Sequence, residues 1–181
     1  MRLAFMPALV AMLIAAATTA FAADKENTLY IDLKDGRVVI EMRPDLAPKH
    51  VAQIKKLVRE GKYNGVVFHR VIEGFMAQTG DPDGTGMGGM GDRLPAEFSR
   101  EPHVRGTVSM ARTSDPNSAR SQFFICFAPA PSLDGQYTVW GKVVSGMEFV
   151  DKIKKGAPGS GAVAPPADKM LKVQVAADVK G

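Results

Sequence analysis

Cysteine is almost absent from this sequence of 181 residues, which contains Cys126 and no other. No disulfide can therefore form within one chain, and the fold has to rely on its apolar core. Cys126 lies in the apolar run 123–127, and the local sequence offers it no basic partner. A reactive cysteine needs such a partner or a helix N-terminus to lower its pKa. We therefore expect Cys126 to be a core residue.

Histidine is also scarce, and the common hydrolase motifs are missing. The three histidines, His50, His69 and His103, lack the spacing that would bring them to one face as metal ligands. Neither a G-x-S-x-G motif nor an H-E-x-x-H motif occurs in the sequence. We expect no metal site and no cofactor, and we interpret the histidines as surface or packing residues.

Charge of one sign is not concentrated anywhere in the chain. The 23 Lys and Arg residues are scattered among 19 Asp and Glu residues, and the formal net charge is +4. Nucleic-acid-binding proteins gather their basic residues on one face, so we expect no nucleic-acid partner. The length fits one domain, because domains typically hold about 100–200 residues.

The one long apolar stretch lies near the N-terminus, from Leu3 to Ala17, and follows the positive charge of Arg2. Small residues stand at positions 20 and 22, a pattern typical of a secretory signal peptide. The alternative, an uncleaved membrane anchor, is disfavoured because a spanning helix needs about 20 apolar residues. We predict a signal peptide over residues 1–22 and one mature domain over residues 23–181. We therefore expect an exported protein without membrane attachment after cleavage, periplasmic if the source is a Gram-negative bacterium.

Short runs of alternating or continuous apolar residues dominate the mature chain. Two runs flank the turn signal Asp35-Gly36 and predict a β-hairpin. The predicted strands span residues 28–33, 37–42, 67–71, 75–79, 107–111, 122–127, 138–144 and 170–176.

Two segments have helical patterns instead. The first begins at Pro48 and ends near Gly61. The second follows Ser145-Gly146-Met147-Glu148, which matches a capping box, and ends at Gly156. Many short strands with two isolated helices predict a closed or sandwich-like β fold with helical plugs.

A glycine-rich segment, residues 80–91, fits no regular element. It contains a G-x-G-x-x-G string over residues 84–89 and an acidic spacing similar to a calcium loop. The dinucleotide-binding form of that string needs a helix that begins at the loop, and a calcium loop needs flanking helices and a final glutamate. Both are missing, so we interpret the segment as a flexible loop that allows another part of the chain to approach closely.

Several residues around one arginine fall on shared strand faces, because successive strand residues point to opposite sides. The predicted strands place Phe68 with Arg70, Met76 with Gln78, and Gln122 with Phe124, whereas His69, Phe123 and Ile125 point the other way. Both faces carry large apolar groups, so we expect one face to fill the core and the other to line a groove.

These motifs resemble the signature of the cyclophilins. Residues 68–81 read FHRVI-x-GFM-x-Q-x-GD, and the strings GTG at 84–86, SMA at 109–111, SQFFI at 121–125 and LDG at 133–135 follow in the family's order. The resemblance implies a closed eight-stranded antiparallel barrel capped by two α-helices. It also implies peptidyl-prolyl cis-trans isomerase activity on proline-containing peptides and on unfolded or folding proteins, and a monomer.

The resemblance implies a role for each matching residue. Arg70 matches the family's catalytic arginine, beside an apolar pocket for the proline ring and side chains that hold the peptide backbone. The residues implied in catalysis are Arg70, Phe75 and Gln78, and those implied in substrate binding are Met76, Gly84, Ala111, Arg112, Gln122, Phe124, Leu133 and Tyr137.

Three positions depart from the pattern of many eukaryotic members. Ser132 replaces a tryptophan, Tyr137 a histidine and Arg112 an asparagine, so the resemblance is closer to bacterial cyclophilins and we expect weak cyclosporin binding. Trp140 lies in a predicted strand and is expected in the core. Two other functions stay open at this point. One is a non-catalytic chaperone or peptide-binding module of the same fold; the other is a lipid- or pigment-binding barrel, which would need an apolar interior cavity.

Overall fold

The computed structural model describes residues 24–180 of the chain. The predicted signal peptide and its cleavage site lie outside the described residues. Within the described part, no helix is both long enough and apolar enough to cross a membrane.

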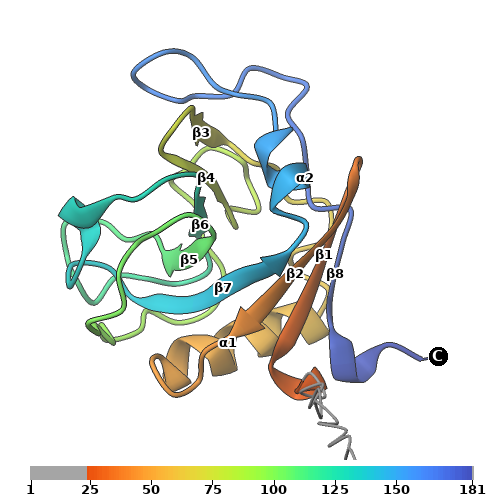
Figure 1. Ribbon diagram of the computed structural model, residues 1–181, viewed down its shortest axis with the longest axis vertical. Coiled ribbons are helices and arrows are strands. Elements are labelled where there is room, and N and C mark those ends of the chain that lie inside the picture. The colour runs from red at the N-terminus through yellow and green to blue at the C-terminus, as the bar shows by residue number, and fades with distance from the viewer. Residues whose placement is uncertain (1–23, 181) are drawn as a thin grey trace, which may run out of the picture.

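Eight strands form one antiparallel sheet that curves around the core (Figure 1). Its order is β3-β4-β6-β5-β7-β2-β1-β8, so β1 lies next to β8, the last strand of the described residues. The strands are β1 (Thr28–Leu33), β2 (Gly36–Met42), β3 (Arg70–Ile72), β4 (Met76–Thr79), β5 (Thr107–Met110), β6 (Phe123–Cys126), β7 (Val139–Ser145) and β8 (Lys172–Val175).

The sheet is a half-barrel, and the prediction of a closed barrel is wrong. The edge strands β3 and β8 do not pair with each other. A single bridge, Val67 with Lys169, joins the segments that precede them. The outer edge of β3 is instead covered by residues 156–163: the Val71 amide donates to the Gly161 carbonyl at 2.8 Å, and the Val71 carbonyl accepts from the Gly156 amide at 2.8 Å. Because those backbone groups are already satisfied, no ladder with β8 can form there.

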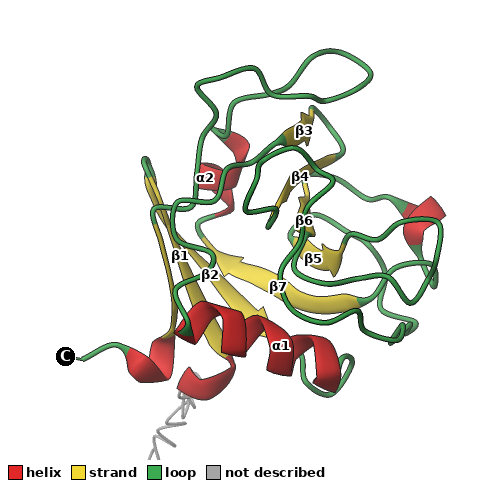
Figure 2. Cartoon of the chain, turned by 180° about the vertical axis from the view of Figure 1, so that it is seen from behind, coloured by secondary structure: helices red, strands yellow, loops and turns green. Residues whose placement is uncertain are grey.

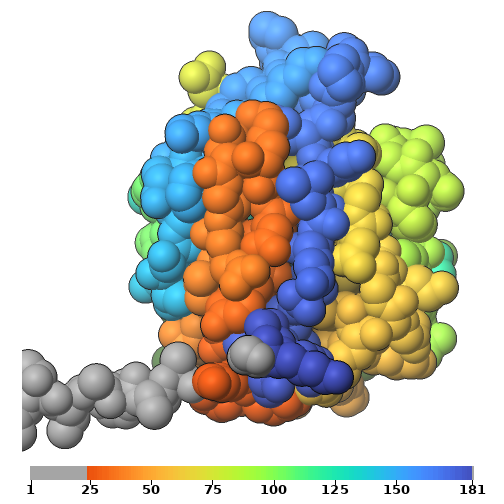
Figure 3. Space-filling model, turned by 90° about the vertical axis from the view of Figure 1, so that its right-hand side faces the viewer, coloured from red at the N-terminus to blue at the C-terminus, as the bar shows by residue number. Residues whose placement is uncertain are grey.

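The C-terminal part of the chain covers the gap between the two edges. Figure 3 shows it as a blue band between the orange β1–β2 hairpin and the yellow segment before β3. The Phe68 amide donates to the Asp168 carbonyl at 2.8 Å, and the Met170 amide donates to the Val66 carbonyl at 2.9 Å. These few hydrogen bonds tie the ends of the half-barrel together.

Two helices lie at opposite ends of the sheet (Figure 2). α1 (Pro48–Arg59) begins with its proline at the first turn and buries Val51, Ile54 and Leu57 against one end of the half-barrel. α2 (Met147–Asp151) buries Val150 near the other end. Burial of such apolar side chains is the main favourable term that holds the helices in place.

The core lies between the sheet and α1. Trp140 is fully buried, as predicted, and its ring meets Phe123 edge to face with centroids 5.3 Å apart. Cys126 is also buried, as predicted, and burial raises the pKa of its thiol to about 12.

Most predicted elements are confirmed to within two residues, and three details are wrong. β3 begins at Arg70 rather than at residue 67. Ser145 does not form a capping box, because it is the last residue of β7, where it pairs with Val39, and the α2 N-cap is the left-handed Gly146. α2 stops before Gly156, since the carboxylate of Asp168 accepts the Lys154 amide at 2.8 Å and replaces the next helical bond.

Candidate active site

A second apolar cluster lies on the face of β3, β4 and β6 that points away from the main core. Met76, Phe124 and Cys126 form its centre, and Phe75, Leu133 and Tyr137 are among the residues that pack around it. On the same strands, Ala77, Phe123 and Ile125 point into the main core. This alternation confirms the expectation of one core face and one groove face.

Strand register brings the polar and apolar parts of the groove together. Arg70 on β3 stands opposite Gln78 on β4, which stands opposite Phe124 on β6. Directly opposed strand residues have their Cβ atoms about 5 Å apart. The three side chains therefore form one row across the sheet.

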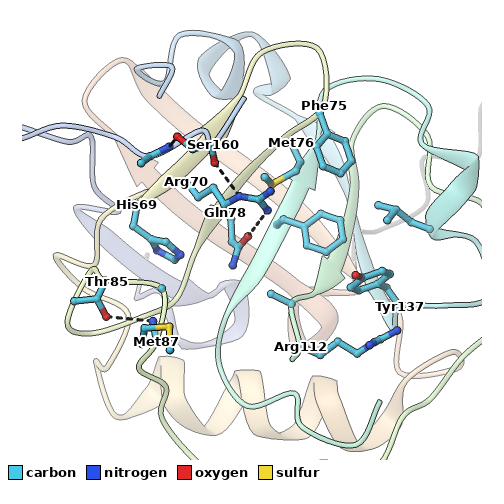
Figure 4. Close-up of a pocket in the computed structure, with 15 residues that line it drawn as sticks. His69, Arg70, Phe75, Met76, Gln78, Thr85, Met87, Arg112, Tyr137 and Ser160 are labelled. Carbon is cyan, nitrogen blue, oxygen red and sulfur yellow. Dashed lines mark hydrogen bonds between the residues drawn. The ribbon is translucent and has the colours of Figure 1, made fainter. Parts of the chain in front are cut away.

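A cavity of about 330 Å³ opens at this row (Figure 4). Nine residues predicted for the site line it: Arg70, Phe75, Met76, Gln78, Ala111, Arg112, Phe124, Leu133 and Tyr137. The structure does not bring the other two into this cavity. Gln122 lines an adjoining one, whereas Gly84 lines neither and lies against Val67, 2.9 Å from where its Cβ would stand.

Arg70 is held at the cavity wall by neutral oxygens. Its Nε donates to the Ser160 carbonyl at 3.2 Å and its Nη1 donates to Gln78 Oε1 at 3.3 Å (Figure 4). Within residues 24–180, Arg70 forms no salt bridge with a carboxylate. A guanidinium carries five N–H donors in a rigid plane, so Arg70 keeps donors for a ligand.

The apolar wall is supported from behind by a buried histidine. His103 stacks on Phe124 with ring centroids 6.1 Å apart, and Tyr137 meets Phe124 edge to face at 5.8 Å. The ring of His103 is fixed at both nitrogens, by Asp134 Oδ1 at 3.0 Å and by Ser109 Oγ at 3.0 Å. The Phe124 ring is therefore packed between two aromatic side chains.

Arg112 lies on the rim of the cavity. Its guanidinium carbon is 4.6 Å from the centroid of the Tyr137 ring, and its Nε donates to the Gln136 carbonyl at 3.0 Å. Cation–π contacts of this kind hold an arginine close to an aromatic face.

A second cavity of about 190 Å³ adjoins the first and shares Gln78, Gly86, Met87, Ala111 and Arg112 with it. Arg93 and Arg120 line it as well, and none of its lining residues is acidic. The groove thus continues from an apolar pocket into a basic one.

Sequence reasoning missed several lining residues: His69, Thr85, Gly86, Met87, Ser160 and Ala162. His69 was expected on the face opposite Arg70 and Phe68 beside Arg70; both predictions are wrong. The chain before Arg70 is not a regular strand, so the alternation does not extend to it. Phe68 is 1% exposed and belongs to the core, whereas His69 lines the cavity and burial lowers its pKa.

The loop residues could be found only in part from the sequence. The GTG string at 84–86 was a signal for Thr85 and Gly86. Ser160, which is 90 positions away from Arg70, and the nearby Ala162 come from a distant loop, and no motif marks them.

Comparison with known proteins agrees with this geometry. Residues 28–175 match the family model of the cyclophilin-type peptidyl-prolyl cis-trans isomerase/CLD. The chain is 60% identical over 186 aligned positions to a probable peptidyl-prolyl cis-trans isomerase of Brucella suis, with 96% of this chain and 94% of the relative covered. It is 45% identical to peptidyl-prolyl cis-trans isomerase B of Bacillus subtilis, over 72% of this chain and 92% of the relative.

Solved structures show the same fold. Cyclophilin AquaCyp293 from Hirschia baltica matches with a TM-score of 0.77 and 30% identity, over 87% of this chain and 77% of that one. A Cryptosporidium parvum cyclophilin crystallised in the presence of the dipeptide Ala-Pro matches with a TM-score of 0.75 and 29% identity, over 82% of this chain and 98% of that one. From these matches, the chain belongs to the cyclophilin-type peptidyl-prolyl cis-trans isomerases.

Proposed function

We propose that Arg70 accelerates X-Pro isomerisation by donating a hydrogen bond to the prolyl nitrogen of the twisted peptide bond. Rotation about this bond is slow because it breaks amide conjugation. In the twisted state the nitrogen regains a lone pair, which a permanently charged guanidinium binds better than it binds either planar isomer. Preferential binding of the twisted state is the condition for a faster reaction.

The observation that carries this proposal is the position of Arg70 next to an apolar cavity, with only neutral hydrogen-bond partners among residues 24–180. Ser160 and Gln78 orient the guanidinium without neutralising it. A charged hydrogen bond contributes about 1.5–3 kcal/mol, which corresponds to roughly one to two factors of ten in rate. The apolar wall around Met76 and Phe124, which holds the proline ring while the rest of the peptide turns, supplies the remainder.

The substrates that we propose are X-Pro segments of exported proteins during folding. The Cryptosporidium parvum cyclophilin was crystallised in the presence of the dipeptide Ala-Pro, which supports proline-containing peptides as ligands of this chain. The signal-peptide pattern in residues 1–22 supports export, to the periplasm if the source has two membranes.

The test is Arg70→Ala, with Arg100→Ala as a matched control that removes an exposed arginine outside both cavities. NMR exchange spectroscopy on an X-Pro tetrapeptide measures kcat/KM without a coupling enzyme, and peptide titration measures affinity. We expect Arg70→Ala to lower kcat/KM at least about tenfold, with the thermal midpoint unchanged. A wild-type rate in that variant would overturn the proposal and leave a binding function for the groove.

A further inference from the structure

Asp81 has a buried carboxylate that the site described above does not use. Asp81 lies two residues after the end of β4 and is 0% exposed. Its two oxygens accept the backbone amides of Asp83 at 2.9 Å, Thr85 at 2.9 Å, Gly86 at 2.6 Å and Gly88 at 3.2 Å, and the Thr85 hydroxyl at 3.1 Å. Burial alone would raise the pKa of Asp81, but these donors outweigh it and hold the pKa below its ordinary value.

The loop 83–88 is built around this carboxylate. A Cβ at position 88 would overlap Asp81 Oδ1, so only glycine lets the backbone approach so closely. The next residue, Gly89, has no such constraint, because a Cβ there would lie 3.4 Å from Arg120. The close fit at Gly88 indicates that Asp81 sets the path of the loop.

The loop in turn fixes the orientation of Gln122. The Nε2 group of Gln122 donates to the Gly86 carbonyl at 3.0 Å and to the Gly88 carbonyl at 2.7 Å. Both hydrogens of the amide are therefore directed at the loop. Its Oε1 is left to face Gln78, whose Nε2 donates to it at 2.9 Å.

The same orientation passes on to Arg70. Because Nε2 of Gln78 donates to Gln122, Oε1 of Gln78 faces Arg70 and accepts a hydrogen bond from its Nη1 at 3.3 Å. A side-chain amide has donors on one end and an acceptor on the other. If the loop carbonyls moved away, both amides could turn over, and Gln78 would then present a donor to the guanidinium instead of an acceptor.

We propose that Asp81 is a positioning residue of the isomerase, which holds loop 83–88 so that Gln122 and Gln78 present an acceptor to Arg70. This inference rests on the proposed role of Arg70. It predicts that a substitution at Asp81 lowers the rate only while Arg70 is present, even though Asp81 lines neither cavity.

The test is a double-mutant cycle between Asp81→Asn and Arg70→Ala. Asp83→Asn is the matched control, since it removes an exposed carboxylate from the same loop. We expect Asp81→Asn to lower kcat/KM about tenfold through kcat, the size of one weakened hydrogen bond. In the Arg70→Ala background the same change should cost less than about twofold, and Asp83→Asn should leave both rates unchanged.

A second pair of variants covers the case in which Asp81→Asn does not fold. Gly88→Ala displaces the Asp81 carboxylate without removing its charge, and Gly89→Ala is its control. We expect Gly88→Ala to lower kcat/KM and to shift the Arg70 Nε–H resonance in NMR spectra. Gly89→Ala should cause neither change.

The outcomes separate the two proposals. A wild-type rate in a folded Asp81→Asn or Gly88→Ala variant overturns the positioning role of Asp81. An equal loss of kcat/KM with and without Arg70 overturns it as well. If Arg70→Ala alone leaves the rate unchanged, the proposed function of Arg70 is wrong, and the positioning role of Asp81 that rests on it is wrong too.

Discussion

Arg70 and Gln78 occupy directly opposed positions of β3 and β4, and a hydrogen bond of 3.3 Å joins Nη1 of the arginine to Oε1 of the glutamine. The Ser160 carbonyl accepts from Nε of the same guanidinium at 3.2 Å. Two fixed acceptors therefore determine the plane of the guanidinium, and the shape of the side chain matters as much as its charge.

We expect Arg70→Lys to lose most of the activity of the wild type. A lysine keeps the positive charge, but its compact ammonium cannot bind Ser160 and Gln78 and still present a donor in a fixed plane. The expected fall in kcat/KM is at least about tenfold, measured by NMR exchange on an X-Pro peptide. A rate within twofold of the wild type would show that charge alone is sufficient.

Phe124→Ala should reduce both stability and substrate affinity. Phe124 is 5% exposed and stacks on His103, and replacing a buried phenylalanine with alanine costs about 3–5 kcal/mol. We expect a lower thermal midpoint together with a higher KM, because the apolar wall of the cavity is lost. Phe98→Ala, at a residue that is 42% exposed, is the control and should change neither quantity.

Charge selectivity should follow from the basic cavity. Arg93, Arg112 and Arg120 line it without an acidic neighbour among the lining residues. We expect peptides with Glu within two residues of the proline to be turned over about fivefold faster, in kcat/KM, than peptides with Lys at the same position, since exposed ion pairs contribute about 0.2–1 kcal/mol each.

The preference should weaken with salt, because screening acts strongly on exposed charges. Arg93→Ala combined with Arg120→Ala should abolish most of it and leave turnover of neutral peptides unchanged. A Glu-to-Lys ratio that does not respond to these two changes would contradict this origin of selectivity.

Stability should fall in mild acid because of His50. Burial lowers the pKa of this imidazole from its ordinary 6.5, and its 2.6 Å contact with Glu97 Oε2 opposes the shift only in part. In the unfolded chain His50 therefore binds a proton near pH 6.5, whereas in the folded chain it binds the proton only at a lower pH. The contribution of neutral His50 to the unfolding free energy is fully present above that pH and decreases as the pH falls through it.

Urea titrations at pH 7.5 and 5.5 measure this difference. His50→Asn should flatten the dependence, while a smaller part remains from His69, whose pKa burial also lowers. An unchanged difference between the two pH values in His50→Asn would assign the effect to other groups.

Much of the fold could be predicted because its signals are local. The β1–β2 hairpin follows from Asp35-Gly36 between two alternating runs, and α1 follows from Pro48 and its apolar face. The open edge could not be predicted, because residues 156–163 cover β3 and the sequence does not mark which distant segment satisfies a strand edge. The start of β3 was misplaced for the same reason, since tertiary contacts rather than propensity end the regular strand at Arg70.

The residues of the site also divide into those that local signals predict and those that they do not. Strand alternation places Met76, Gln78 and Phe124 on one face, and the family motifs single out Arg70. The contribution of Ser160 depends on how a distant loop folds back, which is a property of the whole chain rather than of any motif.

The pairing of β1 with β8 has a consequence for the rate of folding. Leu29 stands opposite Val175, so this edge of the sheet forms only after two segments that lie far apart in the sequence have met. Such pairing pays the entropy of closing a long loop before it stabilises the fold, and it slows folding relative to folds with local contacts. The hydrogen bond from Arg70 to the Ser160 carbonyl is another contact between distant segments. The orientation of the guanidinium thus depends on the same slow, long-range assembly as the sheet itself.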